Sequence, residues 1–460
     1  MKLTLIGGGG VRSPLFVSAS LRRAERIGLQ ELCLMDIDAR KLAVFGALTK
    51  EIVRAAGDPF RVITTTNTRE ALEGASHVVT TIRVGFEQGR VFDERIALKH
   101  GVLGQETTGP GGFAMALRSI PVILGYAQLL EEISPGAWMY NFSNPAGLVT
   151  QALREAGYKR TVGICDGANT GQHTVAGWLK VKNDRLHAEV YGLNHLSWTR
   201  KILLDGKDVL AGLLRDPAFH SRTMLRMFDR ELVEQIGMWL NEYLYYYYYA
   251  ERAVRSITAE EKTRGEEILE LNQRLLQQLE QIDVERNPQD ALKAFYAYEH
   301  RRHSTYMHYA LPDAPTPEEA DLQASAEHAM PVEAGEGYAG VALGIVEALE
   351  TGLPLYTALN VPNLGAIDGM REDDVVEVSC RVDRAGIHTL PIGEIPEAHL
   401  RLMQSVKLYE KLTVQAIRTH SRQTAIQALM AHPLVMSYSR AKSLVEEYLQ
   451  AHATYVGEWI

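Results

Sequence analysis

The first 42 residues decide the fold: MKLTLIGGGGVRSPLF opens the chain, and ELCLMDIDARKL, residues 31–42, closes the stretch. The short apolar run at 2–6 predicts one buried parallel strand. Four glycines follow at 7–10, the segment 15–27 favours a helix, and a second apolar run, 31–35, ends at Asp36. Strand, glycine turn, helix, strand and acid is the order of a dinucleotide-binding βαβ unit.

This unit supplies the candidate cofactor residues Gly7, Gly9, Arg12 and Asp36. Glycines let the backbone approach a pyrophosphate, the helix N-terminus favours its negative charge, and the acid can accept hydrogen bonds from a ribose diol. Gly7 and Gly9 fit the G-x-G-x-x-G pattern, whereas Arg12 stands where the third glycine belongs. The alternative is a tight strand-to-helix turn that binds nothing.

Composition and length limit the class of protein. The chain has 460 residues, which predicts two domains, and we place them at 1–170 and 171–460. A net charge of -9 argues against a nucleic-acid partner, and three scattered cysteines fit a reducing compartment. We find no apolar run near the ~20 residues of a membrane span. The chain starts with its first strand, so we expect no signal peptide and a soluble, cytoplasmic protein.

Strands and helices alternate through residue 164, which predicts an open parallel sheet with crossover helices, a doubly wound Rossmann-type fold. Ligands bind such sheets at the carboxyl ends of the strands. Arg83 ends one strand, and we read residues 84–113 as a long loop rich in glycine and charge that carries Arg95 and Glu106. A loop of this length is usually functional or disordered, and each arginine also fits plain surface charge.

Two further strand ends carry polar side chains. Asn141 and Asn144 lie in NFSNPAG, where their amides can bind a cofactor or a sugar hydroxyl, although Asn-Pro is also a simple turn. Cys165 ends a strand before Asp166, and YGLNHLSW places Asn194 and His195 about thirty residues later. Thiolate and imidazole are good ligands for transition metals, and one of each leaves positions open for substrate. The alternative is a buried cysteine beside a core histidine.

The rest of the chain differs in composition. It predicts a mixed α+β region with a tyrosine tract at 245–249, a long helix at 264–283, an exposed acidic loop at 310–331 and a single helix at 397–430. Rings at successive helical positions point in all directions, so most of these tyrosines should pack against other elements or a second copy of the chain. One of them can act as a general base if a nearby cation lowers its pKa.

Taken together, the motifs resemble glycoside hydrolase family 4, the NAD- and metal-dependent glycosidases of the lactate/malate dehydrogenase-like superfamily. The resemblance spans the N-terminal half, continues past residue 245 and keeps the family's order. GQETTGPGG and NFSNPAG are its most specific parts. The matching stretches, which include these two motifs, are LTLIGGGG…RSP, MDIDARKL, DERIALKHGVLGQETTGPGGF, NFSNPAGLVTQAL, VGICD, YGLNHLSW and NEYLYYYYY.

This resemblance implies an unusual hydrolysis of small carbohydrate substrates. NAD+ takes a hydride from carbon 3 of the sugar, a base removes the acidified hydrogen on carbon 2, the aglycone is eliminated, water adds, and the hydride returns. This mechanism differs from the two-carboxylate mechanism that most glycosidases use. The resemblance implies that Cys165 and His195 bind manganese or another divalent ion. It implies that Tyr243, or Tyr245 if the register slips, is the base and that Asp166 is the acid. It also implies a cofactor contact for Asn141 and substrate contacts for Arg83, Arg95, Glu106, Asn144 and Asn194.

Some departures from the family pattern bear on the substrate. Members acting on 6-phosphorylated sugars carry an arginine near the late helix where this chain has Ala334, which leaves the need for a phosphate open. The alternative sources of positive charge are Arg301, Arg302 and Arg90. Asp166 resembles the acid of the family's α-glycosidases and favours an α-glycoside. The alternatives are an NAD-dependent sugar or 2-hydroxy-acid dehydrogenase, or a catalytically silent NAD-binding relative. The tyrosines and long helices favour a homodimer or homotetramer.

Overall fold

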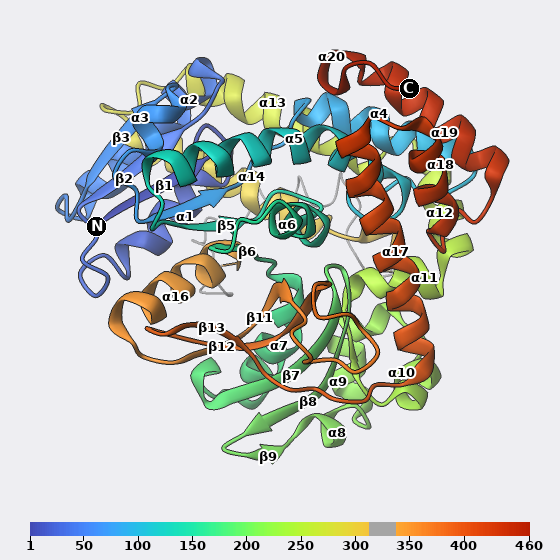
Figure 1. The fold of residues 1–460 in the computed structure, drawn as a ribbon. Helices are drawn as coiled ribbons and strands as arrows, with labels where there is room; N and C mark the ends of the chain where they lie inside the picture. The colour runs from blue at the N-terminus through green and yellow to red at the C-terminus, as the bar shows by residue number, and fades with distance from the viewer. Residues whose placement is uncertain (312–336) are drawn as a thin grey trace.

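The larger sheet sets the architecture (Figure 1). This computed structural model describes residues 1–311 and 337–460, and within them nine strands pair in the order β13-β12-β11-β6-β5-β4-β1-β2-β3. Strands β1 to β6 are parallel in the order 3-2-1-4-5-6 of dinucleotide-binding folds, which confirms the predicted fold class. The bounds are Lys2–Ile6 (β1), Glu31–Met35 (β2), Arg61–Thr65 (β3), His77–Thr80 (β4), Trp138–Asn141 (β5), Thr161–Gly163 (β6), Leu355–Pro362 (β11), Val375–Asp383 (β12) and Gly386–Thr389 (β13).

Strands β11 to β13 extend this sheet with antiparallel pairing, so the last third of the chain contributes to it. Helices flank the sheet in two groups: α1, α2 and α16 pack in series, as do α3, α5 and α6. The division of the chain at residue 170 stays a prediction. The bounds are Ser13–Leu21 (α1), Ala39–Ala55 (α2), Thr68–Leu72 (α3), Pro110–Ile133 (α5), Ala146–Glu155 (α6) and Gly337–Thr351 (α16).

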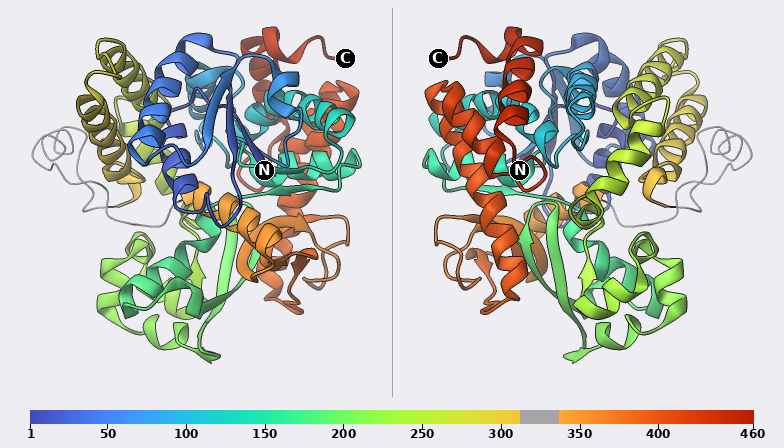
Figure 2. Two further views of the ribbon diagram at one scale, coloured as in Figure 1. Left: turned by 90° about the vertical axis from the view of Figure 1, so that its left-hand side faces the viewer. Right: turned by 90° about the vertical axis from the view of Figure 1, so that its right-hand side faces the viewer.

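A second, smaller sheet lies below the parallel strands β1 to β6 in both views of Figure 2. It pairs β10-β8-β7 with β9 on β8, and the sequence analysis did not predict its strands. The motif YGLNHLSW forms the hairpin between β7 and β8, with His195 in the turn at a φ of 63°. The bounds are Leu186–Leu193 (β7), Leu196–Leu204 (β8), Lys207–Asp208 (β9), Trp239–Leu240 (β10), Thr170–Leu179 (α7), Leu210–Leu213 (α8), Pro217–Arg222 (α9) and Arg230–Ile236 (α10).

The C-terminal helices correct one expectation. The single helix expected at 397–430 is two helices, because His420 adopts a left-handed φ of 48° and the Ser421 hydroxyl caps the second helix at Thr424. The expected acidic loop lies outside the described residues from 312 onward. The bounds are Tyr245–Tyr248 (α11), Ala250–Ala259 (α12), Arg264–Glu280 (α13), Pro288–Ser304 (α14), Glu397–Thr419 (α17), Arg422–Ala431 (α18), Tyr438–Ala451 (α19) and Ala453–Val456 (α20).

The expected loop at 84–113 was the largest error, because most of it is helical. Helix α4 spans Phe86–Lys99 between α5, α13 and α19. Its charged residues Arg90, Asp93 and Glu94 are buried, and Arg118 of α5 pairs with Asp93 at 2.6 Å. These partners come from distant segments and neutralise charges that, in the sequence, resemble a solvated loop.

Helix α5 also departs from expectation. Among the described residues, α5 is the one helix that is long and apolar enough to span a membrane, with a mean hydropathy of 1.5. Such a helix is weak evidence for a membrane, since buried core helices pass the same test. Most of its first half is buried, from Pro110 to Ile120.

Candidate active site

The predicted site residues gather at the carboxyl ends of the parallel strands. Gly7 follows β1, Asp36 follows β2, Asn141 ends β5 and Cys165 lies just beyond β6. Helix α16 begins beside Asp166 and Arg12. A Cβ on Gly337 would lie 3.3 Å from Asp166 Oδ2, and the Tyr338 hydroxyl donates to the Arg12 carbonyl at 3.4 Å. One edge of the sheet therefore holds both the expected cofactor residues and the expected metal ligands.

On the side of β1 and β2, the glycine turn and the acid meet directly. The Gly9 amide donates to Asp36 Oδ2 at 2.9 Å, and the Asp38 amide donates to Asp36 Oδ1 at 3.0 Å. A Cβ on Gly9 would come within 3.0 Å of the Asp36 carboxyl, so a side chain there would crowd the contact. Burial raises the pKa of Asp36. This arrangement fits a dinucleotide, whose ribose hydroxyls can donate to the remaining carboxylate lone pairs.

Arg12 and the two asparagines have different surroundings. The Arg12 guanidinium lies 5.5 Å and 5.6 Å from the ring centres of Phe142 and Tyr338, beside the N-terminus of α1. The Asn141 side chain accepts from Thr80 Oγ1 at 2.9 Å and donates to the Ser143 carbonyl at 3.0 Å. Its amide thus holds the turn together. The Asn144 side chain makes no hydrogen bond to another described residue.

The expected metal ligands lie together. Cys165 Sγ is 3.5 Å from His195 Nε2, and both residues are buried. This separation is roughly what a thiolate and an imidazole keep when they bind one ion through bonds about 2.0–2.3 Å long. Burial lowers the pKa of His195 to about 4, which keeps the imidazole neutral as metal binding requires. In the described part of the chain, no three His, Cys, Asp or Glu residues converge on one point, so such an ion would keep open positions.

Tyr243 completes this cluster. It lies in the short 3-10 helix Glu242–Leu244, and its ring stacks on His195 with centres 3.8 Å apart and planes 6° apart. Tyr245 instead stacks on Tyr249, away from the histidine. Burial, followed by the charge of Glu106, raises the pKa of the Tyr243 hydroxyl well above its usual value. The structure therefore places Tyr243, and not Tyr245, beside the expected metal ligands.

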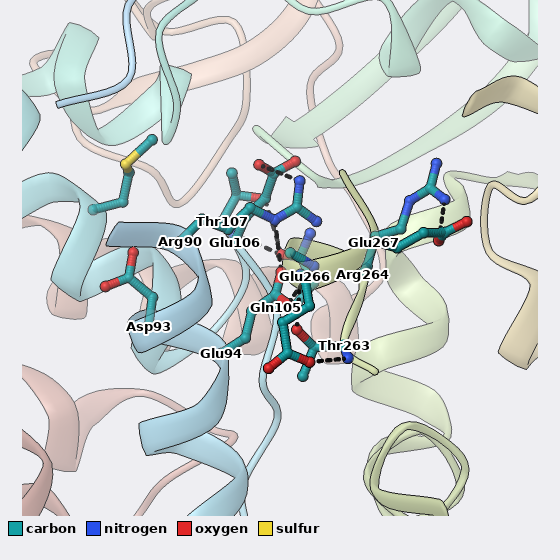
Figure 3. Close-up of polar contacts among 12 residues, drawn as sticks. Arg90, Asp93, Glu94, Gln105, Glu106, Thr107, Thr263, Arg264, Glu266 and Glu267 are labelled. Atoms are coloured by element: carbon teal, nitrogen blue, oxygen red, sulfur yellow. Dashed lines mark hydrogen bonds and ion pairs between the residues drawn. The ribbon is translucent and has the colours of Figure 1, made fainter. Parts of the chain in front are cut away.

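An ion triad of Arg83, Glu106 and Arg90 borders the cluster, and Figure 3 shows two of its members, Arg90 and Glu106. Glu106 Oε2 accepts from Arg83 Nη2 at 2.6 Å and pairs with Arg90 Nη1 at 3.1 Å. Burial alone would raise the pKa of Glu106, but the charges of Arg90 and Arg83 hold it well below its usual range. Arg90 also interacts electrostatically with Tyr243. Arg90 was predicted only as an alternative source of charge for a phosphate and not as one of the main substrate contacts.

Arg95 does not join this triad. Its side chain is 45% exposed, and its guanidinium pairs with Glu266 and donates to the Glu261 carbonyl at 3.0 Å. Five residues separate Arg90 from Arg95, so the two point to different sides of α4. The helical period of this segment was the signal that would have favoured Arg90, but a segment read as a loop offers no period.

Two further acids near the cluster were not predicted. Glu242 and Glu377 are buried, and burial raises the pKa of each to about 7. Glu377 Oε1 accepts from Asn194 Nδ2 at 3.3 Å, and Asn194 Oδ1 accepts from the Gly147 amide at 3.4 Å. Asn194 thus orients the hairpin that carries His195. Glu242 precedes Tyr243 in the sequence and could have been found from that neighbour, whereas Glu377 comes from a distant strand.

The fold and the site together define an enzyme of the dinucleotide-binding α/β class, with a thiol–imidazole pair and a tyrosine at the cofactor edge. Sequence comparison narrows the class. The Family 4 glycosyl hydrolase profile matches residues 2–181, and the Family 4 glycosyl hydrolase C-terminal domain profile matches residues 190–435. The chain belongs to family 4 of the glycosyl hydrolases.

Similar proteins cover nearly the whole chain. A probable 6-phospho-beta-glucosidase of Bacillus subtilis (strain 168) is 32% identical over 100% of this chain and 98% of its own. The 6-phospho-beta-glucosidase of Thermotoga maritima, solved with manganese, NAD+ and glucose-6-phosphate, is 27% identical with a TM-score of 0.82 over 99% of each chain. A 6-phospho-alpha-glucosidase from gut microorganisms, solved with NAD and glucose-6-phosphate, is 25% identical with a TM-score of 0.81, covering 100% of this chain and 99% of its own.

Proposed function

We propose that this protein hydrolyses small glycosides with NAD+ and a divalent metal ion, manganese by preference, through oxidation at carbon 3 of the sugar and proton removal at carbon 2. The observation that carries the proposal is the contact of Cys165, His195 and Tyr243 at the sheet edge that also holds the Gly9–Asp36 turn. The two solved relatives described above, both of which contain NAD, support it.

Different residues of the chain have different proposed roles. Gly7, Gly9, Arg12 and Asp36 hold the dinucleotide, and Cys165 and His195 hold the metal ion. When bound, the dinucleotide would supply a hydride acceptor and the metal ion would supply a Lewis acid. Asp166, next to Cys165, is the proposed acid that protonates the leaving group.

Tyr243 is the proposed base that removes the proton from carbon 2. Its ring is held against His195, so its hydroxyl stays close to the metal ligands. Its raised pKa means that the hydroxyl is protonated in the isolated chain. An ionised phenol is favoured beside a divalent cation and beside Arg90, and these charges supply what the base needs.

The proposed substrate is a small glycoside or its 6-phosphate, with the phosphate favoured by the named relatives. Arg83 Nη1 is buried and has no hydrogen-bond partner among the described residues, so it is a donor available to an anionic or hydroxyl group. Arg302 adds positive charge near Glu106. Ala334, where the family's phosphate-binding arginine would stand, lies outside the described residues.

A panel of nitrophenyl α- and β-glucosides, each with and without a 6-phosphate, tests the proposal. We expect hydrolysis that requires both Mn2+ and catalytic NAD+ and yields no net NADH, with α-substrates favoured by Asp166. Stoichiometric NADH would indicate the alternative, a sugar or 2-hydroxy-acid dehydrogenase, and no turnover with any substrate would indicate a silent NAD-binding relative. A dehydrogenase has no need of the thiol–imidazole pair, which is why we favour hydrolysis.

We also infer a homodimer or homotetramer that works in the cytoplasm without a nucleic-acid or membrane partner. A groove of about 650 Å3 between α4 and α12 is lined by apolar residues that include Leu98, Val254 and Leu434, and Met436 nearby is 74% exposed. An apolar surface of this kind supports contact with a second copy. Light scattering should give two or four times the protomer mass of 51.2 kDa, and the protomer mass would contradict the inference.

A further inference from the structure

The loop that precedes α5 contains a hydrogen-bond network centred on the Gln105 side chain. Gln105 Oε1 accepts from the backbone amides of Thr107 at 2.7 Å and Thr108 at 2.6 Å. Backbone amides only donate, so this side-chain atom must be the oxygen and not the nitrogen. The Thr107 hydroxyl lies 3.0 Å from the same oxygen and can only donate to it.

The glycines of the GQETTGPGG motif hold this loop in place. A Cβ on Gly111 would lie 2.0 Å from the Gln105 carbonyl oxygen, and a Cβ on Gly112 would lie 2.0 Å from the Thr107 carbonyl oxygen. No other residue type fits at these two positions while the loop stays where it is. Gln105 and Thr107 are both buried, so water does not compete for their hydrogen bonds.

His195 receives the other end of this arrangement. Its Nδ1 lies 2.8 Å from the Thr107 hydroxyl oxygen. The hydroxyl hydrogen has an acceptor in Gln105 Oε1, which leaves the hydroxyl oxygen able to accept from Nδ1–H, the arrangement that a metal ion on Nε2 requires. Nε2 then carries a lone pair, and it is the atom that lies 3.5 Å from Cys165 Sγ.

We propose that Gln105 and Thr107 are positioning residues that fix the tautomer and orientation of His195 for a divalent metal ion. Their proposed effect is exerted through the imidazole, which Thr107 contacts at Nδ1. The inference rests on the proposed function, because it needs a metal ion at Cys165 and His195. Partners of this kind typically change metal affinity by 10–100-fold when they are removed.

Binding of Mn2+ to the full-length protein with NAD+ present, followed by electron paramagnetic resonance, tests the proposal. Thr107→Val keeps the shape but removes the acceptor, and we expect its Kd for Mn2+ to rise about 10–100-fold. Thr107→Ser keeps the hydroxyl and should stay within about threefold of the unchanged protein. Thr108→Val is the matched control, because Thr108 Oγ1 is buried in the same loop without a hydrogen-bond partner among the described residues.

Three outcomes overturn the inference: unchanged Mn2+ affinity in Thr107→Val, equal losses in Thr107→Val and Thr108→Val, or no rescue by Thr107→Ser. Failure of the unchanged protein to bind Mn2+ would instead contradict the proposed function, and this inference with it. NAD+ affinity should be the same in all variants, and a parallel loss of NAD+ affinity would indicate a general disturbance of the fold and overturn the specific role.

A measurement on the unchanged sequence keeps the proposal falsifiable if Thr107→Val does not fold. Metal-free protein labelled with 15N-histidine, with His195→Gln used for assignment, should show His195 protonated at Nδ1 and bare at Nε2. A proton on Nε2 would overturn the proposal, because the ring would then present a donor to the metal position.

Discussion

The two halves of the site are built in different ways. On the nucleotide side, defined by Gly7, Gly9 and Asp36, the contact from Gly9 to Asp36 joins residues only 27 positions apart. On the metal side, defined by Cys165, His195, Tyr243 and Thr107, the contact from Thr107 to His195 joins residues 88 positions apart. The first half is contained in one βαβ unit, whereas the second exists only after the hairpin, the α5 loop and the tyrosine segment have packed together. Substitutions should therefore separate the two halves.

The largest effect is expected from Cys165→Ser. Loss of the thiolate removes one of two protein ligands, and Lewis-acid stabilisation is worth several kcal/mol, so kcat should fall on the order of a thousandfold. Mn2+ binding should be lost while NAD+ binding, measured by calorimetry, stays unchanged. Cys380→Ser is the matched control, since the Cys380 thiol only donates to the Val378 carbonyl. Equal loss of NAD+ binding in Cys165→Ser would show that the halves are not separable.

The next effect concerns stability and compares two arginines of one helix. Arg90→Met leaves Glu94 buried without its arginine and Glu106 with Arg83 as its remaining partner, so the free energy of unfolding should fall by about 3 kcal/mol. Arg95→Met removes an exposed pair with Glu266 and should cost less than about 1 kcal/mol. Urea denaturation measures both. A large loss of activity in Arg95→Met would restore its predicted role as a substrate contact.

On the nucleotide side, Asp36→Asn should weaken NAD+ binding about 10–100-fold, because a hydrogen bond to a charged acceptor is worth roughly 1.5–3 kcal/mol. Mn2+ affinity should not change. Asp38→Asn is the control, because Asp38 caps α2 through the Lys41 amide and asparagine caps equally well. Unaltered NAD+ affinity in Asp36→Asn would remove the acid from the cofactor site.

The smallest effect is a pH dependence that belongs to neither half. His432 is buried, and burial lowers its pKa from 6.5 to about 3. The unfolded chain binds this proton below about pH 6.5 and the folded chain does not, so the free energy of unfolding falls as the pH drops from about 6.5 toward 3. His432→Asn should flatten this fall by roughly 1–2 kcal/mol between pH 7 and 5. Denaturation curves of both proteins at several pH values measure the difference, and identical slopes would contradict it.

The contrast between the halves also explains what the sequence could predict. The ends of β1, β2 and α6 agree with expectation because glycines, Asp36 and the NFSNPAG turn act locally. Helix α4 was missed because the partners of its buried charges lie in α5, α13 and the Glu106 loop. Long-range packing turns the helix face of Arg90 toward Glu106, and the sequence of the helix alone does not reveal that packing. Residue chemistry singled out Cys165 and His195 as possible metal ligands, and the likeness to family 4 added Tyr243 and a shared role, but no spacing argument could establish the proximity of the three.

The most direct test of the whole account is hydrolysis in D2O. With Mn2+ and NAD+ present, removal of the proton from carbon 2 and its later replacement from solvent should leave deuterium at carbon 2 of the released sugar, observed by NMR, with no net NADH. A sugar released at full rate with only hydrogen at carbon 2 would contradict the account, because the bond to carbon 1 would then have been cleaved without the proposed oxidation and elimination.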